Sequence, residues 1–230
     1  MKKLLVAALG LAVATSAFAQ TNQVLSRNAV GYIKTTTEPN KIYLLSAPFV
    51  NLANGSDNHS VTNLLAGVPN STVVSLWDDT AQGYISFSKS GRGVWDASAQ
   101  TSVVARGKAF FVRIPGSAST NDLYIMGEVP DATTAPTTTQ SRASGLSFRG
   151  HPYPVAVAFT GTAFAVAAPN STVVSIWDAS TQSYLSYSKS GRGVWDAGAQ
   201  SASLQAGQGL IIRSAAAPNN WTEVKPYTWP

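Results

Sequence analysis

The chain has 230 residues, no cysteine, and a formal net charge of +5 from 16 Lys and Arg against 11 Asp and Glu. The lack of cysteine excludes disulfides, lipoprotein attachment, a thiol nucleophile and cysteine-ligated metal sites. Charged residues make up only 12% of the chain, without a basic cluster. Nucleic acid is therefore not an expected partner, because phosphate backbones are bound by dense cationic surfaces.

The first predicted element is a secretory signal peptide over residues 1–19. It has a basic start at Lys2-Lys3, an apolar run from Leu4 to Ala14, and the small-x-small sequence Ala17-Phe18-Ala19. The apolar run is shorter than the roughly 20 residues of a spanning helix, so no transmembrane anchor is expected. Without this leader the charge falls to 14 − 11 = +3. We expect a bacterial protein that is secreted to the periplasm, the cell surface or the medium.

Short runs of β-branched and aromatic residues between turn residues predict strands along the rest of the chain. In chain order they are 29–35, 42–47, 72–77, 84–88, 109–114, 123–129, 172–177, 184–188 and 210–213. In the fifth run Phe110, Val112 and Ile114 alternate with Phe111 and Arg113. This alternation predicts a sheet with one buried face.

Helix signals are few and short. Val61–Ala66 follows the N-cap residue Ser60, and Thr162–Ala167 is its expected counterpart. Trp77 and Trp177 each end a strand that is apolar on both faces, which favours burial of both rings. The fold class predicted is all-β, with two tandem sandwich-like, jelly-roll-like units that contain at most a short helix each.

An internal repeat defines these two units. Residues 69–100 and 169–200 are identical at 24 of 32 positions without a gap, and Ser88–Ala97 recurs unchanged as Ser188–Ala197. Self-similarity at a fixed spacing indicates one folding unit used twice. We predict the first β unit at 20–129 and the second at 146–230. The Thr- and Pro-rich segment 130–145 between them is predicted to be a linker or an extended edge crossing.

The repeated motif Ser-Lys-Ser-Gly-Arg-Gly-Val-Trp-Asp permits two interpretations. Its paired glycines allow a tight loop with arginine at the tip. In the first interpretation the tryptophan plugs the end of the sandwich and the aspartate bonds the loop amides. In the second, the motif forms two equivalent sugar sites in which aromatic rings stack on the ligand and polar arms orient it. The residues of those two sites are Tyr84, Arg92, Trp95 and Asp96, and Tyr184, Arg192, Trp195 and Asp196.

Catalysis is not predicted. His59 and His151 lie in predicted loops and neither belongs to the repeated motif, while Glu38, Glu128 and Glu223 stand singly. A nucleophilic triad needs an oriented base, and a glycosidase needs two carboxyl groups that face one cleft. No metal-ligand spacing is present, so we expect neither a metal nor another cofactor.

Several short motifs resemble the uncharacterised secreted tandem-repeat β proteins that Verrucomicrobia-type bacteria encode in multiple copies. They are Asn28–Tyr32, Gly107 followed by Ala109–Arg113, Gly127–Val129, and Trp221–Pro230. The resemblance covers most of the mature chain. It implies an exported, non-enzymatic β protein, and it assigns no functional residues.

Two functions are consistent with these features. The first is a structural or surface-assembly subunit that associates with itself as a homo-oligomer or filament, as the low charge and the Ser-, Thr- and Ala-rich composition suggest. Its N-terminal strand, Val24 to Thr36, either adds to the sheet edge of a neighbour or pairs within its own chain. The alternative is a carbohydrate-binding protein with two equivalent sites and a cell-surface polysaccharide as partner, in which the two sites act with avidity.

Overall fold

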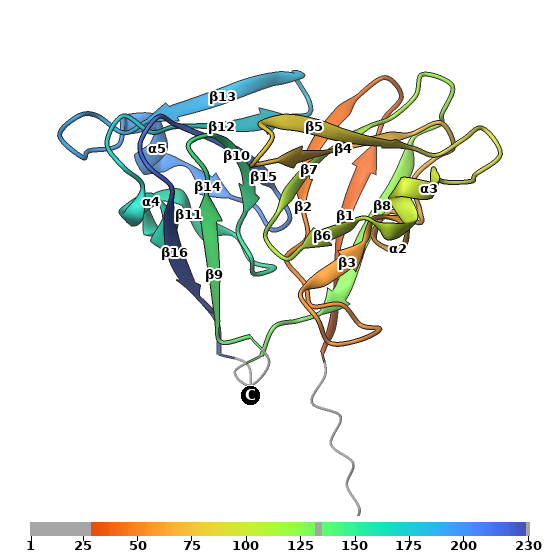
Figure 1. Cartoon of the computed structure of the whole chain (residues 1–230), viewed down its shortest axis with the longest axis horizontal. Coiled ribbons are helices and arrows are strands. Elements are labelled where there is room, and N and C mark those ends of the chain that lie inside the picture. The colour runs from red at the N-terminus through yellow and green to blue at the C-terminus, as the bar shows by residue number, and fades with distance from the viewer. Residues whose placement is uncertain (1–28, 132–134, 229–230) are drawn as a thin grey trace, which may run out of the picture.

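The computed structural model describes residues 29–131 and 135–228, so the expected signal peptide at 1–19 lies outside the described residues. Strands dominate, and they form two similar groups that lie side by side (Figure 1). The predicted all-β class with sandwich-like repeated units is confirmed. The nine predicted strands are all present, with ends that shift by one or two residues.

The first group contains eight strands and two short helices. They are β1 (Val30–Thr37), β2 (Ile42–Ser46), β3 (Asn58–Ser60), α2 (Val61–Leu64), β4 (Val73–Asp78), β5 (Gly83–Ser88), α3 (Ala97–Thr101), β6 (Val103–Ala105), β7 (Ala109–Arg113) and β8 (Asn121–Glu128). A four-stranded sheet has the order β2-β7-β4-β5, and two-stranded sheets pair β1 with β8 and β3 with β6. The N-terminal strand therefore pairs within its own chain over its described residues, from Val30 onward.

The second group repeats this arrangement strand for strand. It contains β9 (Thr137–Arg142), β10 (Gly145–Gly150), β11 (Val157–Ala158), η1 (Phe159–Gly161), α4 (Ala163–Ala167), β12 (Val173–Asp178), β13 (Ser183–Ser188), α5 (Ala197–Ser201), β14 (Ser203–Leu204), β15 (Gly209–Ser214) and β16 (Asn219–Val224). Its sheets are β10-β15-β12-β13, β16-β9 and β11-β14. Each β-ladder among the described residues is antiparallel.

Two expectations need correction. Part of the segment predicted to be a linker or an extended edge crossing, Thr137–Arg142, is the extended strand β9 and not a linker; it pairs with β16 and so belongs to the second group. Its inward side chains are polar, which hides the strand period: Arg142 is buried, and two of its guanidinium nitrogens donate to backbone carbonyls. Each group also has two short α-helices, because α3 and α5 begin after Asp96 and Asp196 in an alanine-rich segment that shows no apolar period.

Each group has its own hydrophobic core. In β7 Phe110 and Val112 are fully buried while Arg113 is exposed, which confirms the predicted alternation. The first core also contains Phe49 and Leu65. The second core is built around residues such as Phe159, Phe164, Leu204 and Leu210.

A third core joins the two groups. It consists of Leu44, Trp77, Ala109 and Phe148, from both groups. The rings of Trp77 and Phe148 stack with centroids 5.2 Å apart and an angle of 10° between their planes. We call this cluster the inter-unit core. Burial of Trp77 fulfils the expectation for that residue, whereas Trp177 is only half-buried.

Reciprocal hydrogen bonds across the same boundary give it approximate two-fold symmetry. The Gln82 amide bonds both the N–H and the C=O of Leu146, at 2.8 and 2.9 Å. Gln182 bonds Ile42 in the same way, at 2.8 and 3.1 Å. Leu146 and Ile42 lie on β10 and β2, each of which is one of the two edge strands of its four-stranded sheet. Each group therefore caps an open sheet edge of the other.

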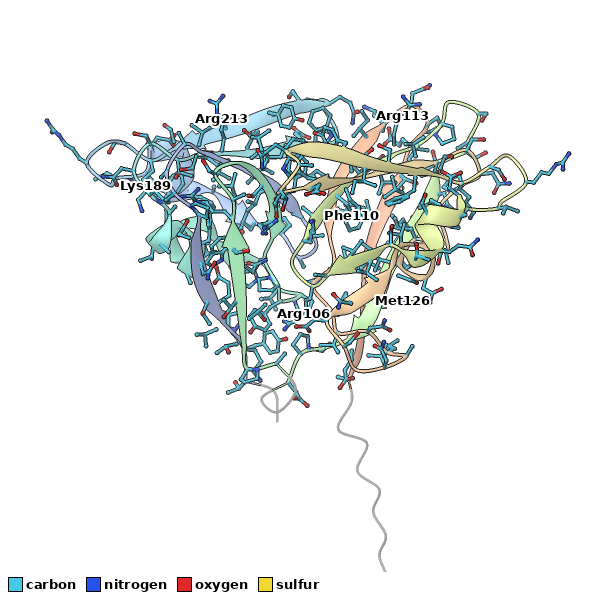
Figure 2. The ribbon with its side chains drawn as sticks, in the orientation of Figure 1. Arg106, Phe110, Arg113, Met126, Lys189 and Arg213 are labelled. Atoms are coloured by element: carbon cyan, nitrogen blue, oxygen red, sulfur yellow. The ribbon has the colours of Figure 1, made fainter. Side chains whose placement is uncertain are left out.

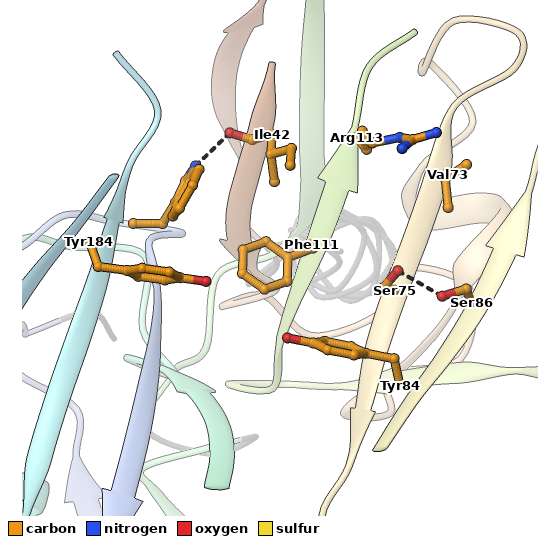
Figure 3. A pocket seen from close by; sticks show the side chains of 9 residues that line it. Ile42, Val73, Ser75, Tyr84, Ser86, Phe111, Arg113 and Tyr184 are labelled. Atoms are coloured by element: carbon orange, nitrogen blue, oxygen red, sulfur yellow. Dashed lines mark hydrogen bonds between the residues drawn. The ribbon is translucent and has the colours of Figure 1, made fainter. Parts of the chain in front are cut away.

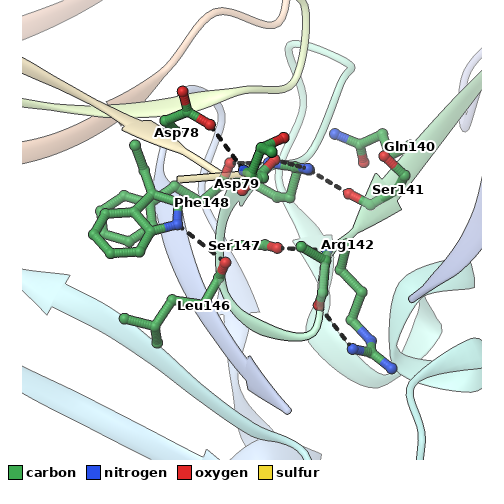
Figure 4. A network of polar contacts seen from close by, with 12 residues as sticks. Asp78, Asp79, Gln140, Ser141, Arg142, Leu146, Ser147 and Phe148 are labelled. Atoms are coloured by element: carbon green, nitrogen blue, oxygen red, sulfur yellow. Dashed lines mark hydrogen bonds and ion pairs between the residues drawn. The ribbon is translucent and has the colours of Figure 1, made fainter. Parts of the chain in front are cut away.

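One ion pair breaks this symmetry. Arg149 of β10 donates to the Asp79 carboxylate of the first group, and its Nε donates to the Ser141 carbonyl at 2.6 Å (Figure 4). The residue equivalent to Asp79 in the second repeat is Ala179. The aspartate that occurs in one copy alone thus has a structural partner in the other group.

Both histidines are buried, and the strand β3 contains His59, which corrects its expected loop position. Burial lowers the pKa of His59, whose Nε2 lies 2.8 Å from the Phe49 carbonyl oxygen. Burial likewise lowers the pKa of His151, against the opposing attraction of Glu223. The unfolded chain therefore binds more protons than the folded chain below about pH 6.5.

We expect the free energy of unfolding to be greatest above about pH 6.5 and to fall as the pH drops through that value. Urea unfolding at pH 7.5 and pH 5 would measure the change before most carboxylates titrate. The double variant His59→Gln, His151→Gln should flatten this dependence. Stability that increases between pH 7.5 and pH 5 would contradict the prediction.

Candidate functional site

The two repeated loops project from opposite ends of the molecule, one after β5 and one after β13 (Figure 1). Gly93 and Gly193 have positive φ angles of 81° and 82°, and Arg92 and Arg192 are exposed at the tips as predicted. A side-chain amide fastens the first loop, because Asn70 Nδ2 donates to the Gly91 carbonyl at 3.0 Å. The second loop has the equivalent bond.

The aspartates of the motif stabilise these loops. Asp96 accepts hydrogen bonds from the Ser88 amide at 2.6 Å and the Ser88 hydroxyl at 2.9 Å. Asp196 accepts the same pair of bonds from Ser188, and it also caps α5 by accepting from the Ala199 amide. The carboxylates therefore act as the first interpretation of the motif expects.

The tryptophans of the motif pack inward. Trp195 is only 7% exposed, its Nε1 donates to the Ala165 carbonyl at 2.9 Å, and its ring meets the edge of Phe159 at 4.8 Å. Trp95 is half-buried against the first core. Neither ring is an open platform for a sugar. Of the eight predicted site residues, the structure brings only Tyr84 and Tyr184 together at one cavity.

That cavity lies between the two groups, and we call it the inter-unit cleft (Figure 3). Its volume is about 390 Å³. The first group contributes β2, β4, β5 and β7, and the second contributes β12 and β13. The lining residues are Ile42, Val73, Ser75, Tyr84, Ser86, Phe111, Arg113, Trp177 and Tyr184.

Four of the nine residues that line the cleft carry aromatic rings. Tyr84 and Tyr184 stand on opposite sides with their hydroxyls directed toward Phe111, which lies between them (Figure 3). Their residues are 53% and 49% exposed, so the rings are open to a ligand. Trp177 meets Tyr184 edge-on at 4.7 Å, and its Nε1 is fixed by a 2.7 Å bond to the Ile42 carbonyl.

The polar groups of the cleft are few and neutral, apart from one guanidinium. Burial raises the pKa of the Tyr84 hydroxyl and of the Tyr184 hydroxyl, so both remain protonated donors near neutral pH. The Arg113 side chain at the rim is exposed. Ser75 and Ser86 bond each other at 2.8 Å through their hydroxyls. No carboxylate stands among the lining residues.

The sequence indicated Tyr84 and Tyr184 as half-exposed aromatic residues but missed the rest of the cleft. Phe111 and Arg113 alternate with the core residues of a predicted strand. That alternation was the sequence signal that could have indicated them as residues of an exposed face. Trp177 reaches the cleft from the other repeat, and nothing local marks that position. Within the described residues, no group of three or more His, Asp or Glu side chains could hold a metal ion.

Comparison with protein-family models, with curated proteins and with solved structures finds no match to this chain. The function is therefore inferred from the geometry of the cleft and from the exposed surfaces. In residues 29–131 and 135–228, no helix has both the length and the apolar character that a membrane crossing requires.

Proposed function

We propose that this chain is an exported, non-enzymatic carbohydrate-binding protein that holds its ligand in the inter-unit cleft. The observation that carries the proposal is the pair of half-exposed tyrosines, Tyr84 and Tyr184, that face each other with Phe111 between them. Only one such cleft forms from the two tyrosines. The proposal therefore replaces two equivalent sites by a single site that both repeats share.

The chemistry of the cleft suits a sugar chain. A pyranose ring has an apolar C–H face that packs on aromatic rings and a rim of hydroxyls that need hydrogen-bond partners. The phenol groups of Tyr84 and Tyr184 and the guanidinium of Arg113 supply those partners. The rings are braced by neighbours, because Tyr84 meets Trp77 edge-on at 4.9 Å and Tyr184 meets Trp177 at 4.7 Å. A braced ring loses little conformational entropy when it binds.

We expect Tyr84→Ala and Tyr184→Ala each to weaken polysaccharide binding by about tenfold or more, because each removes an aromatic contact at the centre of the site. A panel of soluble bacterial polysaccharides would be titrated against the mature chain, with tryptophan emission reporting on Trp177. Calorimetry should give one site per chain.

The matched control is the double variant Arg92→Ala, Arg192→Ala at the loop tips, which should bind as the wild type does. Binding that is lost in this control and kept in the tyrosine variants would overturn the cleft as the site. Failure of every polysaccharide in the panel to change the emission or to release heat would also count against the proposal.

Self-assembly is the second candidate function. Exposed apolar side chains on β1 and β8 favour it, since a solvated sheet face is ordinarily polar. Light scattering and negative-stain microscopy over a concentration series would test it. Oligomers, filaments or sheets are expected, and a monomer at every concentration would exclude this function.

A further inference from the structure

Strand β1 has an open edge, and the ladder register shows which residues face it. Glu128 of β8 exchanges backbone hydrogen bonds with Val50, at 3.0 and 2.8 Å, on the side away from β1. The register sets Val30 opposite Glu128. In an antiparallel ladder, opposed residues alternate between hydrogen-bonded and non-hydrogen-bonded pairs. Val30 therefore also turns its N–H and C=O away from its partner strand.

The same alternation applies along the whole strand. Val30, Tyr32, Lys34 and Thr36 all direct their backbone groups to the open edge, and no described residue bonds those groups. The result is a row of about eight unpaired donors and acceptors. Such an edge is a template for strand addition.

Other strands in the chain have side chains placed on their edges. Gln182 caps β2 and Gln82 caps β10. Strand β9, which occupies the position of β1 in the second repeat, has its Ser141 carbonyl bonded by Arg149 at 2.6 Å. The β1 edge has no corresponding cap among the described residues.

One half of the exposed face of the β1–β8 sheet is apolar, and the other half carries Lys34 and Thr36, both bonded to the Asp122 carboxylate. Val30, Tyr32, Tyr124 and Met126 are 64%, 65%, 42% and 56% exposed. Met126 is labelled in Figure 2. Tyr32 and Tyr124 meet edge-on with centroids 5.7 Å apart. The equivalent β9–β16 face instead exposes mainly threonine, asparagine and serine. The fold itself therefore does not require this apolar face.

We propose that β1 pairs antiparallel with β1 of a second copy, in the register that sets Tyr32 opposite the partner's Lys34. This register also sets Val30 opposite the partner's Thr36, so that all four outward residues pair. The inference deepens the self-assembly role and is independent of the cleft.

The chemistry of the strand selects a second copy as the occupant. Lys34 Nζ is ion-paired with Asp122 Oδ2 of its own chain at 2.7 Å. In this register the Lys34 side chain also lies beside an aromatic ring of the other copy, an attractive arrangement. A register that opposed the two Lys34 residues would lose both of these aromatic contacts and bring together two ammonium groups, each paired with Asp122 of its own chain. The strand is thus complementary to itself, and the join produces a four-stranded sheet in the order β8–β1–β1–β8.

A disulfide test reports the register directly, because the native chain has no cysteine. Hydrogen-bonded opposed residues have Cα atoms about 5.5 Å apart, which fits a disulfide. Mixing the Tyr32→Cys and Lys34→Cys variants of the mature chain should yield a covalent dimer under mild oxidation, and each variant alone should yield little. The control mixture, Thr139→Cys with Ser141→Cys on β9, should yield none.

A proline test reports on the unmodified interface. Lys34→Pro removes an outward N–H without removing a backbone hydrogen bond to β8, because proline is tolerated where the N–H faces solvent. It also removes the ion pair between Lys34 Nζ and Asp122 Oδ2 of β8, at 2.7 Å, and Lys34→Ala is the control for that loss. Sedimentation should show the dimer dissociation constant raised by about tenfold or more, because the dimer loses more than one hydrogen bond. Thr139→Pro on β9 is the matched control and should leave it unchanged.

The outcomes separate the two levels of the proposal. A wild-type monomer at every concentration overturns both the self-assembly role and the β1 interface. A dimer that withstands Lys34→Pro and gives no specific cross-link overturns the β1 interface and leaves self-assembly through another surface. Circular dichroism of each variant verifies that the fold is kept.

Discussion

Trp195→Ala is expected to lower the free energy of unfolding by about 3–5 kcal/mol, as loss of a buried tryptophan does. Trp195 is 7% exposed, meets Phe159 edge-on, and donates its indole N–H to the Ala165 carbonyl. The truncation would open a cavity and leave that carbonyl without its indole partner. A destabilised second core should follow.

The matched control is Trp95→Ala in the identical loop of the first repeat. Trp95 is only half-buried, so we expect its loss to cost less than half as much. Urea unfolding of both variants, followed by circular dichroism, would measure the difference. Equal losses of unfolding free energy in the two variants would contradict the difference in burial between the two rings. A Trp195→Ala variant as stable as the wild type would contradict the position of Trp195 in the second core.

This pair of residues also shows a limit of sequence-based prediction. Ser88–Ala97 and Ser188–Ala197 are identical, so local sequence predicts one environment for Trp95 and Trp195. The environments differ because the surrounding core residues differ: the ring of Trp195 contacts Phe159, from a segment where the two repeats have diverged. Burial of a repeated residue depends on non-repeated neighbours.

The strands could be predicted where one face is apolar. Phe110 and Val112 of β7 alternate with Phe111 and Arg113, and the structure follows this period. The short helix α2 was also readable, since Ser60 accepts the Asn63 amide as its N-cap. Strand β9 could not be predicted, because the side chains on its buried face are polar and make hydrogen bonds instead of apolar contacts.

The cleft could not be predicted as a whole, because it depends on how the two repeats pack. Tyr84 and Tyr184 are 100 residues apart in the sequence, and their meeting follows from the inter-unit core and the reciprocal glutamine bonds. The core pairs show how the packing is specified. Leu44 stands opposite Phe111 in the first group, and Phe148 stands opposite Ile211 in the second. Each cross-strand pair thus combines one large aromatic and one aliphatic residue, in opposite order.

Phe148→Ala should consequently affect both the fold and the site. Phe148 is fully buried, stacks on Trp77 at 5.2 Å, and meets Phe111 and Tyr84 edge-on, each at 5.7 Å. We expect a loss of about 3–5 kcal/mol in the free energy of unfolding. Polysaccharide binding should also weaken, because Tyr84 and Phe111 lose the ring that braces them from behind.

The control for this variant is Phe148→Leu, which places at this position the residue type that Leu44 supplies in the first repeat. Leucine keeps much of the buried volume, so both stability and binding should decline less than in Phe148→Ala. Urea unfolding and tryptophan titration of the same samples would give the two quantities together. Phe148→Ala with wild-type stability would contradict the inter-unit core. The rings of a preorganised site depend on the residues that support them. A Phe148→Ala variant that is destabilised but binds polysaccharide as the wild type does would therefore show that the cleft does not depend on the inter-unit core.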